Sequence, residues 1–129
     1  MKKQEDNQNI ILIVEDDFDL MWMIHKLLSS SGFQVLTAVT AAQAIEVFSR
    51  YIFEIAAVIL DLSLPDKDGE EVAMEFLKVL PEIPIIITTG SEDQTQRNRL
   101  ERLGVSAYLI KPFDLTELVR TIDRLIQHA

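Results

Sequence analysis

Two unbroken apolar runs, each followed at once by acidic residues, limit what this chain can fold into more than any other feature. Residues 56–60 lead directly into Asp61, and residues 10–14 lead into Glu15 and Asp16. Short continuous apolar runs rich in β-branched residues are typical of parallel strands that are buried on both faces. An ionisable group at the end of such a strand is costly unless another group compensates it or uses it. The two runs therefore predict a buried sheet with a polar site at the ends of its strands.

Strand and helix patterns alternate five times along the chain. The predicted strands are residues 10–14, 34–38, 56–60, 84–89 and 107–110. The predicted helices are residues 19–31, the segment after Thr40, and residues 69–79, 91–103 and 115–127. Thr40 and Asp114 are the expected N-caps of the second and the last of these helices. This order is typical of an α/β domain whose parallel sheet carries helices on both faces. The helix at 91–103 is predicted to be the least firmly held, because only Leu100 and Leu103 are apolar enough to anchor it.

Length and composition narrow the class of protein further. The chain has 129 residues, no cysteine and a net charge of -9. The length suits one domain, the lack of cysteine excludes a thiolate metal site, and the negative charge weighs against direct nucleic-acid binding. The apolar runs are too short to cross a membrane, and residues 1–9 are polar and lack the core of a signal peptide. We therefore expect a disordered lead-in at 1–9, one domain at 10–128, no membrane partner and a cytoplasmic location.

Polar residues that suit phosphate chemistry follow four of the predicted strands. Glu15 and Asp16 follow the first strand and Asp61 ends the third. Thr89 ends the fourth strand and Lys111 follows the fifth. Right-handed crossovers place these strand ends at one edge of the sheet, where three carboxylates would raise one another's pKa values. A divalent cation resolves that repulsion, and oxygen ligands of this kind suit Mg²⁺. Asp61 then stays ionised and can attack an electrophilic phosphorus, with Lys111 and Thr89 binding phosphoryl oxygens.

The chain resembles the receiver domains of the two-component response-regulator family from about Ile10 to Gln127. The matching motifs are Ile-Leu-Ile-Val-Glu-Asp-Asp at 11–17, Leu-Asp-Leu-Ser-Leu-Pro-Asp-Lys-Asp-Gly at 60–69, Thr-Thr-Gly at 88–90 and Tyr-Leu-Ile-Lys-Pro-Phe at 108–113. Each motif is weak alone, but together they are specific. The resemblance implies a flavodoxin-like, doubly wound fold with a five-stranded parallel sheet in the order 2-1-3-4-5 and five helices.

The resemblance also implies how the acids are used. Asp61 would be the phospho-acceptor, and its phosphoryl group would come from a histidine kinase or a histidine phosphotransfer protein. Glu15, Asp16, Asp61 and the backbone carbonyl of Ser63 would bind Mg²⁺, for which Mn²⁺ can substitute. Glu15 stands where many members of the family have aspartate, and its longer side chain is expected to reach the metal directly or through water.

Thr89 and Tyr108 match the switch residues of the family, and Lys111 matches its lysine. Lys111 would assist catalysis and precede a cis peptide bond to Pro112. Thr89 would assist catalysis and then move toward the bound phosphoryl group, leaving room for Tyr108 to turn inward. The surface of the fourth helix, fifth strand and fifth helix would change as a result. A downstream protein or output domain would bind that changed surface.

Other functions are weaker readings of the same residues. The chain is expected not to be an enzyme, beyond catalysing its own phosphorylation and dephosphorylation. The main alternative is a pseudo-receiver that acts as an interaction module without accepting phosphate. A missing acid or a missing Lys111 would favour that alternative, and the sequence contains all of them. An aspartate-nucleophile phosphatase would have a second acid two residues after the nucleophile, where this chain has Ser63.

The remaining polar and aromatic candidates have competing interpretations. Trp22 lies off the apolar stripe of the first helix, beside His25. These two residues form either ordinary, partly buried surface or a docking face for the kinase or phosphotransfer protein, since aromatic residues are favoured interface anchors. His25 is expected to face solvent. Asp17 is interpreted as a helix-start acid, and Asp66 and Asp68 as solvated turn residues.

Overall fold

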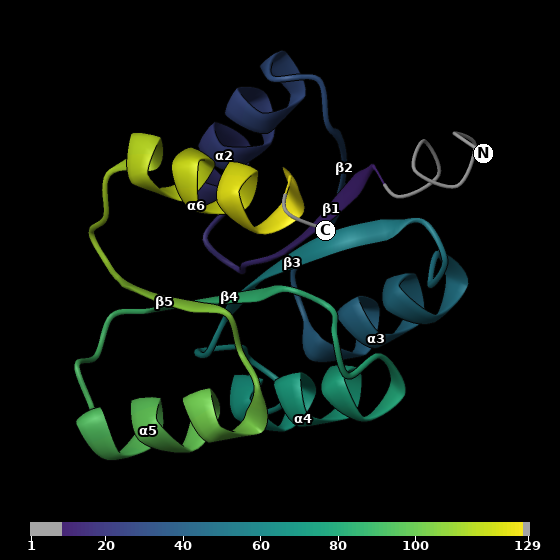
Figure 1. Ribbon diagram of the computed structural model, residues 1–129. Helices are drawn as coiled ribbons and strands as arrows, with labels where there is room; N and C mark the ends of the chain where they lie inside the picture. Colours follow the sequence, from purple (N-terminus) through teal and green to yellow (C-terminus); the bar gives the residue numbers. More distant parts are fainter. Residues whose placement is uncertain (1–8, 128–129) are drawn as a thin grey trace.

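The chain folds as a parallel sheet between two layers of helices (Figure 1). The computed structural model describes residues 9–127. In chain order its elements are β1 (Ile10–Val14), α2 (Phe18–Ser30), β2 (Gln34–Ala38), α3 (Ala41–Arg50), β3 (Ile55–Asp61), α4 (Gly69–Val79), β4 (Ile85–Thr89), α5 (Gln94–Leu103), β5 (Ala107–Ile110) and α6 (Leu115–Gln127). All neighbouring strands pair in parallel, and their order is β2-β1-β3-β4-β5. The predicted flavodoxin-like fold with five helices is confirmed.

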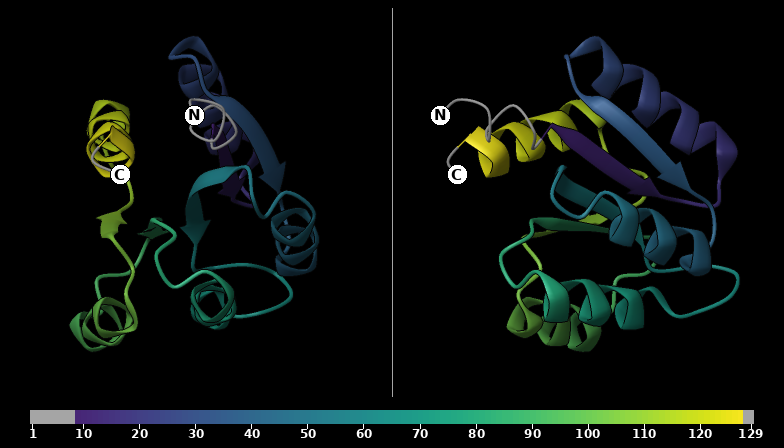
Figure 2. Two further views of the ribbon diagram at one scale, coloured as in Figure 1. Left: turned by 45° about the vertical axis from the view of Figure 1, so that its right-hand side comes forward. Right: turned by 90° about the vertical axis from the view of Figure 1, so that its right-hand side faces the viewer.

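Helices cover both faces of the sheet, which explains why the central strands are apolar throughout. Figure 2 shows α2 and α6 on one face and α3, α4 and α5 on the other. Along β4, Ile85 and Ile87 belong to the core under α3, α4 and α5, whereas Ile86 belongs to the core under α2 and α6. Side chains alternate between the faces of a strand, so a strand that is covered on both faces needs apolar residues at every position.

Local capping groups decide where most of the helices begin. The side chain of Asp17 accepts hydrogen bonds from the N–H groups of Asp19 and Leu20, and Thr40 accepts one from Gln43. The prediction that Thr40 caps a helix and Asp17 starts one is confirmed. The helix predicted at residues 91–103 is α5. Its predicted start at residue 91 is wrong, because Asp93 caps this helix and Gln94 is its first residue.

The helix α5 has one buried residue, Leu100, along its whole length. The prediction that Leu103 also anchors this helix is wrong, since Leu103 is 39% exposed. Polar contacts supply the other attachment: Arg99 donates hydrogen bonds of 2.8 and 2.9 Å to the carboxylate of Glu70 in α4. The guanidinium of Arg97 also lies 5.0 Å from the ring centroid of Tyr108 in β5. Thus α5 is attached through the buried side chain of Leu100, an ion pair to α4 and a cation–π contact to β5.

The ends of the chain are described only in part. Of the predicted lead-in at 1–9, residues 1–8 lie outside the described residues, and so does the predicted domain end at residue 128. The backbone carbonyl of Asn9 accepts a hydrogen bond of 3.2 Å from the N–H of Gln34, so this residue already pairs beside β2. Within residues 9–127, no helix has the length and apolar character that a membrane span requires.

Candidate functional site

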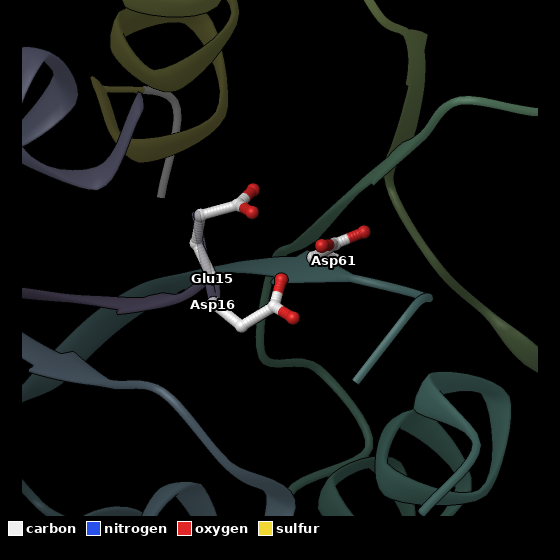
Figure 3. Close-up of side chains that lie close together, drawn as sticks. All are labelled: Glu15, Asp16 and Asp61. Atoms are coloured by element: carbon white, nitrogen blue, oxygen red, sulfur yellow. The ribbon is translucent and has the colours of Figure 1, made fainter. Parts of the chain in front are cut away.

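The predicted acidic residues come together at the carboxyl ends of β1 and β3. These strands are neighbours, with Val14 opposite Leu60, so the acids that follow them are adjacent. Carboxylate oxygens of Glu15, Asp16 and Asp61 lie within 4.8 Å of one another (Figure 3). Glu15 and Asp61 are each 1% exposed, whereas Asp16 is exposed to solvent. The cluster is therefore buried on one side and open to ligands on the other.

Lys111 joins two of the three acids from the end of β5. Its Nζ lies 3.0 Å from Oε1 of Glu15 and 3.2 Å from Oδ2 of Asp61. Its backbone N–H donates a hydrogen bond of 2.7 Å to the carbonyl of Thr89, which fixes it beside the end of β4. The peptide bond between Lys111 and Pro112 is cis, as predicted.

One ammonium group does not balance the charge of the cluster. Burial raises the pKa of Glu15 to about 7, and the charge of Asp61 adds to the shift, against hydrogen bonds from the Asp17 N–H and Lys111 that lower it. Partial burial lowers the pKa of Lys111, but hydrogen bonds and charges from Glu15 and Asp61 outweigh that effect and raise it overall. Lys111 therefore stays charged, while Glu15 holds a proton in part of the molecules at neutral pH. The cluster lacks positive charge.

A small divalent cation fits this deficit. Three carboxylates from two strands offer hard oxygen ligands at close range, and the exposed side of Asp16 leaves room for coordinated water. Glu15, Asp16 and Asp61 are the side chains that would hold Mg²⁺. Ser63, the predicted source of a carbonyl ligand, directly follows the buried Leu62, and its N–H donates a hydrogen bond of 3.1 Å to Asp61.

The carboxylate of Asp61 is oriented by two donors. The N–H of Ser63 donates a hydrogen bond of 3.1 Å to Oδ1, and Nζ of Lys111 lies 3.2 Å from Oδ2. At the end of β4, the Thr89 hydroxyl oxygen accepts a hydrogen bond of 3.2 Å from the N–H of Ser91. That bond uses the oxygen of Thr89 and leaves its hydroxyl hydrogen available for an acceptor. A phosphoryl group on Asp61 would supply such acceptors.

Tyr108 lies in the core next to α5. Its ring is 7% exposed, and its hydroxyl is buried without a hydrogen-bond partner among the residues that the structure describes. The sequence-based hypothesis lets Tyr108 turn inward only after Thr89 moves. In the structure the guanidinium of Arg97 in α5 lies over the Tyr108 ring, 5.0 Å from its centroid. The role of Tyr108 in a switch stays a prediction.

Phe18, Trp22 and His25 form an aromatic surface on α2, which begins two residues after Asp16. Trp22 is 62% exposed, and its ring stacks on that of His25 with centroids 6.0 Å apart. The expectation that His25 faces solvent is only half met, since this residue is half-buried. Phe18, one turn before Trp22, is 65% exposed and was missed because the predicted helix began after it. Its position four residues before Trp22 is the signal that places both on one face.

Asp66 and Asp68 do more than the interpretation as solvated turn residues allows. Both are exposed, but each caps a helix. Asp68 accepts a hydrogen bond of 3.0 Å from the N–H of Glu70 at the start of α4. Asp66 accepts bonds of 2.7 and 3.0 Å from the N–H groups of Ala41 and Ala42, the first two residues of α3. The position of Asp68 directly before a predicted helix is a local signal that it caps α4. No local pattern signals that Asp66 caps α3.

Comparison with known proteins identifies the class to which this fold and site belong. The chain matches the family described as "Response regulator receiver domain" over residues 11–123, and it belongs to that family of two-component signalling domains. It is 32% identical over 125 residues to the probable transcriptional regulator ycf27 of Cyanidium caldarium, covering 97% of this chain and 49% of that protein. It is 31% identical to the transcriptional regulatory protein GlrR of Escherichia coli, covering 92% of this chain and 26% of that protein.

Solved structures agree with this assignment. A response regulator receiver domain protein from Clostridium thermocellum superposes with a TM-score of 0.86 at 28% identity, covering 92% of this chain and 94% of that chain. The non-phosphorylated HemR receiver domain from Leptospira biflexa superposes with a TM-score of 0.85 at 30% identity, covering 91% and 93%. The chain spans about half, 49%, of the length of ycf27 and less of GlrR, so it corresponds to the receiver part of such regulators.

Proposed function

We propose that this receiver domain accepts a phosphoryl group on Asp61 in a Mg²⁺-dependent reaction and so switches a signalling output. The observation that carries the proposal is the setting of Asp61. Its carboxylate lies at the end of a buried strand, between the N–H of Ser63 and Nζ of Lys111, with oxygens of Glu15 and Asp16 within 4.8 Å. A buried carboxylate that is oriented on both oxygens and left open toward a cation site is suited to nucleophilic attack.

The donor is proposed to be a phosphohistidine on a kinase or phosphotransfer protein. An oxygen of Asp61 attacks the phosphorus, and a P–O bond forms as the P–N bond breaks. The electron pair of that bond goes to the imidazole, which takes up one proton. Mg²⁺ bound by the acids would neutralise charge that develops on the phosphoryl oxygens. Catalysis is proposed to be limited to this transfer and to hydrolysis of the resulting acyl phosphate.

The residues of this chain would then rearrange around the new charge. Lys111, which lies 3.0 Å from Glu15 and 3.2 Å from Asp61, would transfer its ion pair to a phosphoryl oxygen. The free hydroxyl hydrogen of Thr89 would donate to another oxygen. Movement of Thr89 breaks its hydrogen bond with the N–H of Ser91, which leads into α5. The surface of α5, β5 and α6 is proposed to change as a result and to bind a downstream protein or an output domain.

The exposed aromatic face of α2, formed by Phe18, Trp22 and His25, is proposed to dock the phosphodonor protein. It begins four residues after the end of β1, so a partner bound there also lies near the acids. Exposed aromatic side chains such as Phe18 and Trp22 are favourable interface anchors. The pseudo-receiver alternative gains no support, because every group that it would lack is present at the site.

Incubation with acetyl phosphate and MgCl₂, followed by intact-mass analysis, tests the proposal. The wild-type chain should gain one phosphoryl group, and omission of Mg²⁺ with excess chelator should abolish the gain. Asp61→Asn preserves the shape of the side chain and removes the nucleophile, so it should gain none. Phosphorylation of Asp61→Asn to the wild-type level, or none in the wild type with several small donors, would reject Asp61 as the acceptor.

A further inference from the structure

The segment between β3 and α4 forms a closed loop at the edge of the acidic cluster. At its base, the N–H of Gly69 donates a hydrogen bond of 3.1 Å to the carbonyl of Leu62. A Cβ on Gly69 would lie 2.6 Å from Cα of Leu62 and 2.7 Å from the carbonyl oxygen of Asp61, so only glycine permits this approach. Six residues, 63–68, therefore leave the sheet and return to the same point.

The far end of this loop is tied to another helix. The two carboxylate oxygens of Asp66 accept hydrogen bonds from different N–H groups of α3, 2.7 Å from Ala41 and 3.0 Å from Ala42. These bonds cross 25 and 24 residues of sequence. The N–H groups of Ala41 and Ala42 hold the pKa of Asp66 below its usual range. Thr40, the residue before the helix, caps the third N–H group, that of Gln43. The start of α3 is thus satisfied jointly by its own threonine and by the loop.

Ser63 lies between the anchored points of the loop. Leu62 on one side of it is buried, and Leu64 on the other side packs against the core under α3 and α4. The N–H of Ser63 orients Asp61, at 3.1 Å from Oδ1. Any displacement of the loop therefore moves a donor to the proposed phospho-acceptor and a peptide group at the proposed metal site.

We propose that Asp66 is a positioning residue for the phosphorylation site, which acts by tying the Ser63–Asp68 loop to the N-terminus of α3. This inference rests on the proposed function, because the groups that it positions are the acceptor and the metal ligands. Asp66 itself touches neither. A carboxylate with two backbone donors has one preferred position, so the loop and the peptide of Ser63 lose freedom that they would otherwise keep.

Three variants separate this role from simple helix capping and from loss of charge. Asp66→Ala removes the tether. Thr40→Ala removes the other cap of α3 and leaves the loop tied, and Asp68→Ala removes an acid from the same loop without detaching it from α3. Mg²⁺ affinity, measured by calorimetry, should weaken by about threefold to tenfold in Asp66→Ala and stay within about twofold of wild type in both controls. Asp66→Asn, with one remaining acceptor, should give an intermediate loss and serves as the test if Asp66→Ala does not fold.

Amide hydrogen exchange tests whether the hydrogen bonds of Asp66 to α3 restrain the loop, and it needs neither metal nor phosphate. The amide of Ser63 should exchange faster in Asp66→Ala than in wild type, Thr40→Ala or Asp68→Ala. Equal Mg²⁺ affinity in Asp66→Ala, Thr40→Ala and Asp68→Ala, or unchanged exchange at Ser63 in Asp66→Ala, would overturn the inference. A wild-type chain that binds no Mg²⁺ and accepts no phosphoryl group would instead overturn the proposed function, and the exchange experiment would still decide whether Asp66 fixes the loop.

Discussion

Lowering the pH should weaken Mg²⁺ binding through one identifiable proton, that of Glu15. Burial raises the pKa of this side chain to about 7. At pH 6 roughly nine in ten molecules would then carry the proton, and at pH 8 roughly one in ten. A cation must displace the proton before Glu15 can act as a ligand, so the apparent dissociation constant should be about tenfold higher at pH 6 than at pH 8.

Calorimetry in buffers of different ionisation enthalpy measures the proton directly. Binding of one Mg²⁺ should release about 0.9 proton at pH 6, about half at pH 7 and about 0.1 at pH 8. Glu15→Gln cannot release this proton, so its Mg²⁺ affinity should be weaker than that of wild type and nearly independent of pH over the same range. Release close to zero at pH 6 in the wild type would refute the claim that burial dominates the environment of Glu15.

Glu15 also determines how the stability of the metal-free chain changes with pH. Because the pKa of Glu15 is higher in the folded chain than its ordinary value of 4.5, the proton stabilises the folded state. That contribution is complete below pH 4.5 and is lost as the pH rises through about 7. A shift of this size corresponds to something on the order of 3 kcal/mol. Urea unfolding with chelator should show the wild type losing stability between pH 5 and pH 8 relative to Glu15→Gln, and Mg²⁺ should restore it.

Three further perturbations test other parts of the structure. Gly69→Ala should destabilise the chain by about 1–3 kcal/mol in urea unfolding, because the new methyl group meets the backbone of Leu62, whereas an alanine at Gly90, which has open space, should cost less. Glu70→Gln should speed amide exchange in α5 several-fold and leave β1 and β3 unchanged, because Arg99 loses its charged partner; equal effects on all elements would exclude a local role. Trp22→Ala should slow phosphorylation by a histidine kinase that phosphorylates the wild type, and leave the rate with acetyl phosphate unchanged; equal slowing with both donors would exclude docking.

The sequence predicts the elements and most of the site because both depend on short-range patterns and on one topological rule. Continuous apolar runs mark buried parallel strands, and right-handed crossovers then bring Glu15, Asp61 and Lys111 to one edge whatever the details of packing. Thr40 and Asp114 are predicted as caps because each binds N–H groups within three residues of itself. Contacts of this kind depend only on the residues next to the helix start, so the local sequence is enough to predict them.

The features that the sequence does not predict depend on contacts between distant segments. The hydrogen-bond partners of Asp66 lie 24 and 25 residues away in the sequence. The residues around Asp66 identify a turn but do not indicate these partners. The burial of Tyr108 in β5 involves a contact of its ring with Arg97 of α5. Leu103 has helical spacing from Leu100 but lies on the exposed side of the helix. Each of these outcomes is decided by how elements pack against one another rather than by local preference.

The unequal attachment of the two sides of the site determines where a new charge can act. On the side of β1 and β3, the loop that follows Asp61 is fixed at Gly69, at Leu64 and at Asp66, so displacing it breaks several contacts at once. On the side of β4, one hydrogen bond holds the Thr89 hydroxyl and α5 buries one residue. A fixed free energy supplied by a phosphoryl group displaces the element whose alternative position costs least. We therefore propose that the side of β1 and β3 keeps the metal and phosphate ligands in place on phosphorylation, while α5 on the side of β4 moves.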